Sequence, residues 1–539
     1  MRLLSGLSGW ADRFFYIGEC MNGRIRITTD VETITYENVI SVIQETIGKH
    51  RTNAQRIQEL IDFEEGNQPL LREKTYRSDI DCQIVDNIAN EIVEFKVGFG
   101  YGNPITFKKR NKVEGKIDAV QEFNDQYLLT DSDSANQELA RFFEIGGICN
   151  TYVDTNEAYE DGDSYYTRTV LDPRTSYMIY SSYYYDKREM AGVTFRKDPD
   201  KVTHFTVFTK DNRFEIKNWQ ILNGNEVVDM WGHETRSGEE NPLHIIPITE
   251  YFRSYDRMGC FERQIDEMNN LNLLISDFSN DVDQNTQTIW WTNDCEFETV
   301  QITHDDGTVT EEIKHPKSNE WMSTFTTRDG KIPKVQPLTV NYDYAGILNN
   351  IVTQRALILQ KCNVPQRNDN SGGSTGVAMS DATGWSAAET AACKEEMVIS
   401  KSLRKELKVI CAAIRESTAC PQDSPLRELL PSDLEPSIKR QKSYELSVKT
   451  TAIATLLGQG FSLEDTLDAV SLFPDPAQVI ERSKEGVEKK QNLSGTEEVT
   501  PQADDPMYQI GNSPVIDGGS KETVETRVET TETNSQNKG

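Results

Sequence analysis

Two long amphipathic helices are the clearest pattern of apolar and polar positions in the chain. Apolar residues recur at three- and four-residue steps over residues 261–282 and again over residues 347–362, and this spacing places them along one side of an α-helix. The first helix has about 24 residues and a length of roughly 36 Å. Its other side carries amides and carboxylates, including Asp277 and Asp281. On pattern alone, the two helices indicate an αα-hairpin with a β insertion inside an ordinary core.

The insertion between these helices, residues 287–340, has the composition of short β-strands. Strand-like composition is found at residues 289–292, 298–302 and 308–310. Asp-Asp-Gly at residues 305–307 and Arg-Asp-Gly at residues 328–330 supply turns, because glycine accepts the positive φ that tight hairpins require.

The part of the chain before these helices divides into helical and β regions. Helical periodicity marks residues 37–63 and 84–95, and the second of these helices is predicted to stop at Gly98. Period-two alternation over residues 164–253 predicts an antiparallel β domain. The alternation breaks at residues 216–219, which indicates a bulge.

The part of the chain after the two helices is helical and then polar. Residues 364–385 form a loop rich in Asn, Gly and Ser, and a loop of this length is usually functional or disordered. A long helix follows, with Ser386 as its N-cap and Glu389 at the capping-box position. Short helices are predicted in residues 444–472, whereas residues 491–539 bury too little apolar surface to fold. We therefore predict an α+β fold.

Net charge, the spacing of cysteines and histidines, and the length of apolar segments exclude several classes of function. The formal net charge of -30 disfavours a protein that wraps a duplex, since phosphate binders display Lys and Arg. An acidic protein can still guide DNA without holding it. The 9 cysteines form no CxxC pair and the 6 histidines have no ligand spacing, so neither a disulfide framework, a metal site nor a cofactor is expected. No segment reaches 18 apolar residues, and we expect a soluble protein that is not secreted.

Other functions would need different patterns. A metal-dependent DNA-processing enzyme requires a carboxylate cluster that binds two Mg²⁺ ions, for which Asp277, Asp281 and Asp283 are the candidates. They lie on one helix without a partner motif, so a solvated helix face is the simpler interpretation. The glycine-rich residues 98–102 follow a helix rather than a strand, which disfavours a nucleotide-binding loop. A capsid scaffold or adaptor protein without DNA contact is the second alternative.

Three stretches carry a resemblance to a known family. Residues 86–105 form a helix that ends in Gly-Asn-Pro-Ile, residues 246–266 lead into the first long helix, and residues 374–379 have the sequence Ser-Thr-Gly-Val-Ala-Met. In this order and spacing, they resemble the portal proteins of tailed bacteriophages, the head-to-tail connectors of the siphophage type. The chain departs from the family pattern at residues 62–66 and 380–385.

The resemblance implies a ring, usually of twelve subunits, at one capsid vertex of a virion that is assembled in the host cytoplasm. We expect neighbouring subunits to cover the apolar stripe of the first long helix at Leu271 and Ile275. In the family's terms, an N-terminal helical region would span residues 1–80, the wing 81–258, the first stem helix 259–286, the clip 287–340 and the second stem helix 341–363. The tunnel loop would span residues 364–385, the long wing helix with its linker 386–442, the crown 443–490 and the disordered C-terminal tail 491–539.

Portal proteins are structural rather than enzymatic, and the resemblance implies a conduit for packaging and ejecting DNA. Implied partners are other copies of the chain, the double-stranded DNA in the channel, the terminase large subunit, a head-completion or adaptor protein, and the major capsid and scaffolding proteins. The resemblance implies no membrane partner. Carboxylates and amides in the channel would repel phosphates over about a Debye length, so that DNA slides.

The candidate site residues follow from this division. Lys361 and Arg367 would offer brief phosphate contacts, although Lys361 suits a helix C-terminal cation equally well. The DNA-channel candidates are Asp277, Asp281, Lys361, Arg367, Asn368, Asn370, Ser371, Gly372, Gly373 and Ser374. The partner-docking candidates in the clip are Asp305, Asp306, Lys314, Lys317, Arg328, Asp329 and Lys331.

Overall fold

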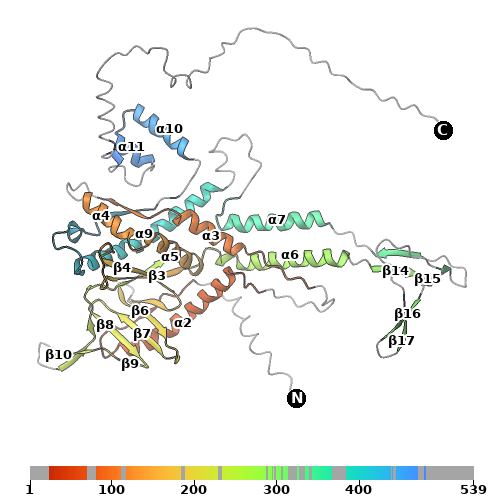
Figure 1. Ribbon diagram of the computed structural model, residues 1–539, viewed down its shortest axis with the longest axis horizontal. Coiled ribbons are helices and arrows are strands. Elements are labelled where there is room, and N and C mark those ends of the chain that lie inside the picture. The colour runs from red at the N-terminus through yellow and green to blue at the C-terminus, as the bar shows by residue number, and fades with distance from the viewer. Residues whose placement is uncertain are drawn as a thin grey trace, which may run out of the picture. The chain divides into compact units, whose positions relative to one another are not determined.

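The computed structural model divides the chain into two units, residues 1–475 and 476–539. The described residues are 23–69, 81–110, 117–183, 188–228, 234–286, 289–293, 295–296, 299–304, 308–313, 325–326, 334–338, 343–366, 384–438, 440, 445–470, 479–480 and 483. All elements named below belong to the first unit (Figure 1).

Helices and strands are both abundant in the described residues, which confirms the α+β class. The helices are α2 (Val39–Glu64), α3 (Ile88–Tyr101), α4 (Ile117–Leu128), α5 (Ser132–Gly146), α6 (Ile265–Thr286), α7 (Tyr344–Lys361), α9 (Trp385–Glu416), α10 (Glu445–Gly458) and α11 (Leu463–Val470), with short 3-10 turns η2 (Glu262–Gln264) and η3 (Pro425–Glu428). The strands before α6 are β1 (Thr28–Thr29), β2 (Thr106–Lys109), β3 (Ile148–Thr155), β4 (Tyr166–Leu171), β5 (Ser176–Ser181), β6 (Glu189–Lys197), β7 (Thr203–Phe208), β8 (Asn212–Lys217), β9 (Gln220–Ile221), β10 (Asn225–Val228), β11 (Glu234–Ser237), β12 (Glu239–Glu240) and β13 (Ile248–Phe252).

The strands within residues 164–253 are antiparallel, as predicted, but they belong to more than one sheet. β4 and β13 pair with β3, β10 pairs with β11, and the others lie in a seven-stranded sheet that also includes β1. Its strand order is β1-β5-β6-β7-β8-β12, with β9 also paired to β8. All of its pairs are antiparallel except β1 with β5. The first half of α2 packs on this sheet: Val39 and Ile43 are fully buried in one cluster with Val193 and Phe214. The sheet and α2 therefore share a core.

The predicted bulge at residues 216–219 is wrong. Lys217 of β8 pairs with Gln220 of β9, so the two residues between them form a tight hairpin turn. Asn218 and Trp219 both have positive φ, 50° and 61°, which is the backbone that a two-residue hairpin of the twisted type needs. Trp219 stacks on Phe205, with centroids 5.6 Å apart. A positive φ is unfavourable for a bulky residue such as Trp219, and the stacking on Phe205 offsets part of that cost.

A second core lies around a three-stranded sheet of order β13-β3-β4. Helices α4, α5 and α9 supply apolar side chains to it, among them the fully buried Phe123, Phe143 and Leu407. The short strand β20 (Leu434–Ser437), which follows α9, pairs antiparallel with β2 and adds Leu434 to the same cluster. Distant parts of the sequence are thereby joined in one body.

Two helix ends differ from the prediction. Helix α3 does not stop at Gly98 but continues to Tyr101, because Phe99 stacks on Phe95 (5.5 Å) and contacts the ring of Trp385. Helix α9 begins at Trp385, one residue before the predicted N-cap Ser386, after a glycine with φ of 88° and without a side-chain cap. Aromatic packing, which capping rules do not consider, decides both ends.

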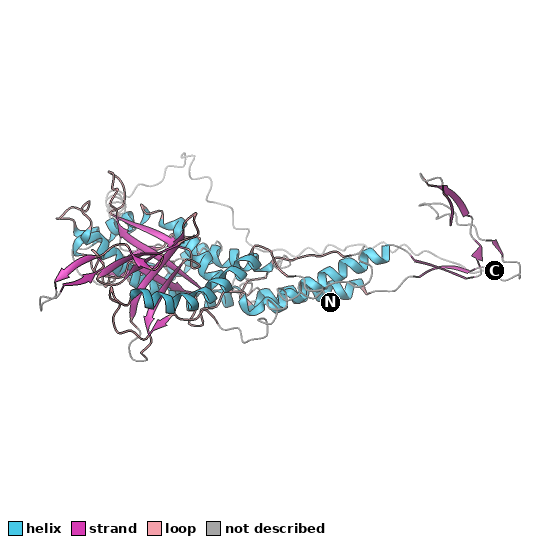
Figure 2. Ribbon diagram, turned by 90° about the horizontal axis from the view of Figure 1, so that it is seen from below, coloured by secondary structure: helices cyan, strands magenta, loops and turns pink. Residues whose placement is uncertain are grey.

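Helices α6 and α7 lie side by side, as both views show (Figure 1 and Figure 2). The insertion between them contains the three predicted strands, β14 (Ile289–Asn293), β16 (Thr299–Thr303) and β17 (Val309–Ile313). It also contains three strands that were not predicted, β15 (Cys295–Glu296), β18 (Phe325–Thr326) and β19 (Lys334–Leu338). They form separate antiparallel pairs, β14 with β19, β15 with β18 and β16 with β17. The β insertion between two long helices is therefore confirmed.

Candidate functional site

The α6–α7 pair is held together by an apolar core within one chain. Leu271 of α6 is fully buried in a cluster with Ile351 of α7 and side chains of α2 and α3, and the half-buried Ile275 packs against it. The rings of Phe278 and Tyr344 meet edge to face, with centroids 5.9 Å apart. The expectation that a neighbouring subunit covers Leu271 is therefore wrong, because the chain's own helices bury it completely. Ile275 is covered only in part by the same helices.

The amide-rich side of α6 holds an extended segment of the same chain. Asn272, Ser276 and Asn280 are buried and stand four residues apart, so they form one row along the helix. Residues 82–86, which we call the strap, lie along this row. Backbone N–H groups at alternate strap positions donate to it: Cys82 to Asn280 (2.7 Å), Ile84 to Ser276 (3.0 Å) and Asp86 to Asn272 (2.9 Å). Four residues of helix rise about 6 Å and two of extended chain about 6.6 Å, so the two periods match.

Helix α7 is tied to the same strap by an ion-paired arginine. Arg355 Nε lies 2.9 Å from a carboxylate oxygen of Asp86, and the same guanidinium donates to Glu91 of α3. Asn272 also donates to Gln68 (2.6 Å), which follows α2. The strap itself therefore contacts α6 and α7, while Asn272 and Arg355 extend the polar contacts to Gln68 and Glu91.

A buried carboxylate fixes the start of α6. Glu262, in the turn η2 just before the helix, is fully buried and accepts hydrogen bonds from Arg24, from Arg56 (3.1 Å) and from the backbone N–H of Gly259 (3.0 Å). Arg24 is itself buried and donates to the carbonyl of Gly146 (3.0 Å). Burial lowers the pKa of Arg24, and the charge of Glu262 opposes that shift. Breaking this pair would leave a charge buried without a partner, which is strongly destabilising.

A second charge network lies between α3, α5, β13 and α9. Arg253 lies 2.8 Å from Glu144 and also pairs with Glu395, which Lys96 approaches to 3.7 Å. Burial raises the pKa of Glu144 to about 7, with a further rise from the charge of Glu395, while Arg253 and Lys96 oppose it. Two carboxylates thus share the two cations of this network.

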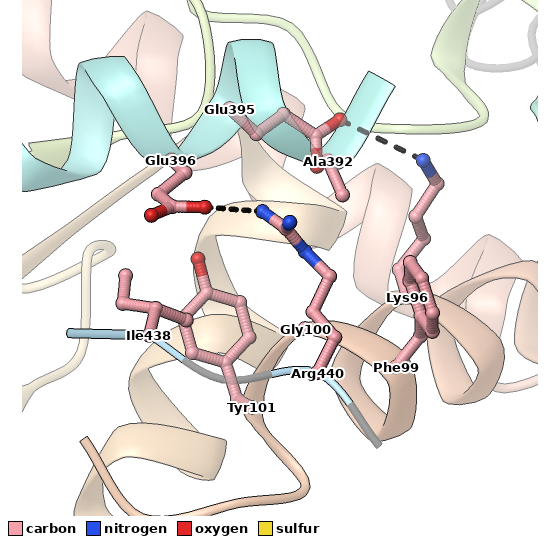
Figure 3. Close-up of a pocket in the computed structure, with 9 residues that line it drawn as sticks. All are labelled: Lys96, Phe99, Gly100, Tyr101, Ala392, Glu395, Glu396, Ile438 and Arg440. Carbon is pink, nitrogen blue, oxygen red and sulfur yellow. Dashed lines mark hydrogen bonds and ion pairs between the residues drawn. The ribbon is translucent and has the colours of Figure 1, made fainter. Parts of the chain in front are cut away.

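A pocket lined by residues of α3 and α9, together with Ile438 and Arg440, lies beside this network. Figure 3 shows Lys96 reaching toward Glu395 and Arg440 reaching toward Glu396. Phe99 and Tyr101 also line the pocket, and burial raises the pKa of Tyr101 well above its usual value. Both cations already face carboxylates, so the pocket offers no free charge to an anionic ligand.

Helix α7 also presents apolar side chains that no part of the described chain covers. Leu348 is 52% exposed and Val352 is 58% exposed, and their four-residue spacing puts them on one face of the helix. Exposed apolar pairs on a helix that already buries another face indicate a contact surface.

The structure describes three of the predicted DNA-channel residues. Asp277 and Asp281 are half-buried on α6. Lys361, in the last turn of α7, pairs with Glu267 near the start of α6, so it connects the two helices as well as complementing the end of α7. The other channel candidates, Arg367, Asn368, Asn370, Ser371, Gly372, Gly373 and Ser374, lie outside the described residues. So do the clip candidates Asp305, Asp306, Lys314, Lys317, Arg328, Asp329 and Lys331.

The sequence analysis did not predict the strap, the buried ion pair of Glu262 with Arg24, or the charge network around Glu144. The four-residue spacing of Asn272, Ser276 and Asn280 is visible in the sequence, but such a row is equally typical of a solvent-exposed helix face. Arg24 and Glu262 are 238 positions apart, and no local pattern connects them.

Within the described residues, no three His, Cys, Asp or Glu side chains are grouped so as to hold a metal ion. No helix in that part of the chain is both long and apolar enough to cross a membrane.

Comparison with known proteins identifies the family. Residues 43–493 match the family model described as phage portal protein, SPP1 Gp6-like. The chain belongs to this portal protein family. The resemblance seen in the sequence is thereby confirmed, and a portal protein is a structural component of the virion. Among solved structures, a chain titled "Neck of empty GTA particle computed with C6 symmetry" matches at 10% identity with a TM-score of 0.38, over 75% of this chain and 95% of that one. No curated protein matches.

Proposed function

We propose that the chain assembles into a closed ring at one capsid vertex and forms the conduit through which double-stranded DNA is packaged and later ejected. The family match over residues 43–493 carries this proposal. In it, residues 81–258 are the wing, residues 259–286 and 341–363 the stem, residues 287–340 the clip, residues 364–385 the tunnel loop, and residues 443–490 the crown.

Subunit packing through the stem has support in the exposed face of α7. Met268 and Leu271 of α6 are already buried, whereas Leu348 and Val352 of α7 remain exposed, although α7 buries Ile351, Ile358 and Leu359 on another face. A neighbouring subunit that covers these two side chains would remove apolar area from water, at roughly 25 cal/mol for each Å². In the proposed ring, α7 therefore contacts the next subunit beside its contact with α6.

The charge of the chain suits transport better than tight binding. With a formal net charge of -30, the subunits surround DNA with a repulsive surface, so that phosphates meet no deep well. Asp277 and Asp281 of α6 would contribute to this repulsion, and Arg367 and the polar residues 368–374 would supply weak transient contacts. Lys361, which pairs with Glu267, would offer only a partly neutralised charge.

The clip is the proposed docking surface for the terminase large subunit and later for head-completion proteins. In the described part of residues 287–340, the strands form separate two-stranded pairs, and such pairs are marginally stable alone in water. Val300, Ile302 and Val309 of the β16–β17 pair are exposed. Exposed apolar side chains and free strand edges favour association with another protein. Charge reversal at Lys314, Lys317 and Lys331 should leave the ring intact and weaken terminase capture in a pull-down.

Two measurements on the purified full chain test the proposal against its alternatives. Mass photometry should give one large closed assembly rather than a monomer. Incubation with linear duplex DNA and Mg²⁺ should leave the DNA intact. Monomers that cut DNA only with the metal would support the DNA-processing enzyme instead, and monomers without effect on DNA would support an adaptor.

A further inference from the structure

Helix α9 carries a row of four cationic side chains and one methionine on its exposed face. Lys394, Met397, Lys401, Arg404 and Lys408 follow each other at steps of three, four, three and four residues, and all five are exposed. This spacing puts them on one narrow stripe, which extends over about 21 Å of helix. We call these five residues the cationic row.

The glutamates of the same stretch all face inward. Glu395 pairs with Arg253, Glu396 with Arg440, and Glu406 is fully buried against Arg168 (3.0 Å). Within the described residues, Lys394, Arg404 and Lys408 have no ion pair, and Lys401 meets only the ring of Tyr255, 5.9 Å from its centroid. Like charges at steps of three and four destabilise a helix by roughly 0.2–0.5 kcal/mol a pair. An uncompensated row therefore points to anions from outside the subunit.

The row includes apolar groups that suit a protein partner better than DNA. Met397 is 76% exposed, and Tyr255 beside Lys401 is 74% exposed. Met, Tyr and Arg are enriched at the centre of protein interfaces, whereas protein–DNA interfaces are more polar. The partner must therefore present carboxylates together with apolar side chains.

The corner between α4 and α5 of the same protein has that composition. Leu128 is 57% and Leu129 50% exposed, and Asp125 and Asp131 beside them are also exposed. Neither aspartate has an ion pair within the described residues, and Asp131 forms no side-chain cap for α5. We call these four residues the acidic corner.

We propose that the cationic row of one subunit docks on the acidic corner of the neighbouring subunit and closes the ring through the wing. This inference rests on the proposed ring and names a contact in addition to the stem. The two surfaces differ, so the contact is head to tail, and repeated head-to-tail contacts close into a ring when the rotation permits. Every subunit then offers one cationic row and one acidic corner.

Charge reversal and re-reversal test the contact in the full-length protein. The variant with Lys401→Glu, Arg404→Glu and Lys408→Glu should associate at least about tenfold more weakly by mass photometry at 150 mM salt, because like charges would then face each other. Adding Asp125→Lys and Asp131→Lys to it should restore the rings. The matched control reverses Lys197, Lys201 and Lys210, which are equally exposed but lie on the seven-stranded sheet and its turns, and it should assemble normally. Circular dichroism checks that each variant is folded.

The results separate this inference from the proposed function. Rings that form normally after reversal of the cationic row would overturn the docking contact and leave the ring proposal standing. Loss of rings without restoration by the acidic-corner variant would also overturn it. Intact rings that lose binding to a short DNA duplex, in a gel-shift assay of the same variant, would assign the row to nucleic acid instead. A wild-type protein that never forms rings would refute the proposed function itself.

Discussion

Replacement of Ser276 by alanine is the most specific perturbation of the strap. Ser276 Oγ accepts the backbone N–H of Ile84 at 3.0 Å and donates to the carbonyl of Asn272 at 2.7 Å. The substitution removes one small buried oxygen and leaves almost no cavity. Its main effect is to leave the Ile84 N–H without an acceptor.

The expected cost follows from that orphaned donor. A buried polar group that loses its partner costs about 1–3 kcal/mol, and 1.36 kcal/mol is a factor of ten in an equilibrium constant. The hydrogen bond of the Ile84 N–H is only partly buried, so water replaces part of it and the lower end of this range applies. Opening of the strap at Ile84 should therefore become roughly fivefold more frequent. Asn280→Ala should act in the same direction at Cys82, because Asn280 both accepts from and donates to that backbone.

Hydrogen exchange measured by mass spectrometry detects this opening locally. Peptides that cover residues 82–86 should exchange faster in the Ser276→Ala protein, while peptides from the seven-stranded sheet stay unchanged. Asn270→Ala is the matched control, because Asn270 is exposed on the same helix and, among the described residues, its side chain hydrogen-bonds only Gln354, at 3.4 Å. Equal exchange in Ser276→Ala and wild type would refute the inference that the polar row holds the strap.

Three further predictions concern assembly, pH and packaging. Leu348→Asp with Val352→Asp should weaken ring formation in mass photometry without unfolding the subunit, since both side chains are exposed; unchanged rings would exclude this face of α7 from the interface. The folded-state pKa of Glu144 is raised from 4.5 to about 7, so the folded state holds an extra proton between these values, and stability should fall as pH rises from about 4.5 to 7. Glu144→Gln should flatten that slope in urea denaturation, and parallel slopes would contradict the assignment. Deletion of residues 369–375 should allow prohead assembly but reduce packaged DNA, and normally filled heads would make the loop a passive connection.

The elements with strong periodicity were predictable, and the contacts between them were not. Helix α6 and the antiparallel strands follow from the spacing of apolar residues, since one buried face is enough to specify each of them. The end of α3 at Tyr101 depends on the contact of Phe99 with the ring of Trp385, which lies far away in the sequence. The turn at Asn218 and Trp219 resembled a bulge because alternation cannot distinguish an inserted residue from a tight turn.

The candidate site was predictable only in outline. Helices α6 and α7 were assigned to one hairpin, but their covered and exposed faces depend on what α2 and α3 bury. Leu271 was expected to meet a neighbour and instead lies in the chain's own core, whereas Leu348 is the exposed residue. Periodicity shows that a stripe is apolar and does not show which element covers it.

Electron cryomicroscopy of the purified full-length protein tests the central claim most directly. The account predicts a closed ring with a central opening, in which Leu348 and Val352 of α7 lie against the next subunit. A monomer, an open chain of subunits, or a ring in which this face of α7 is exposed to solvent would contradict it.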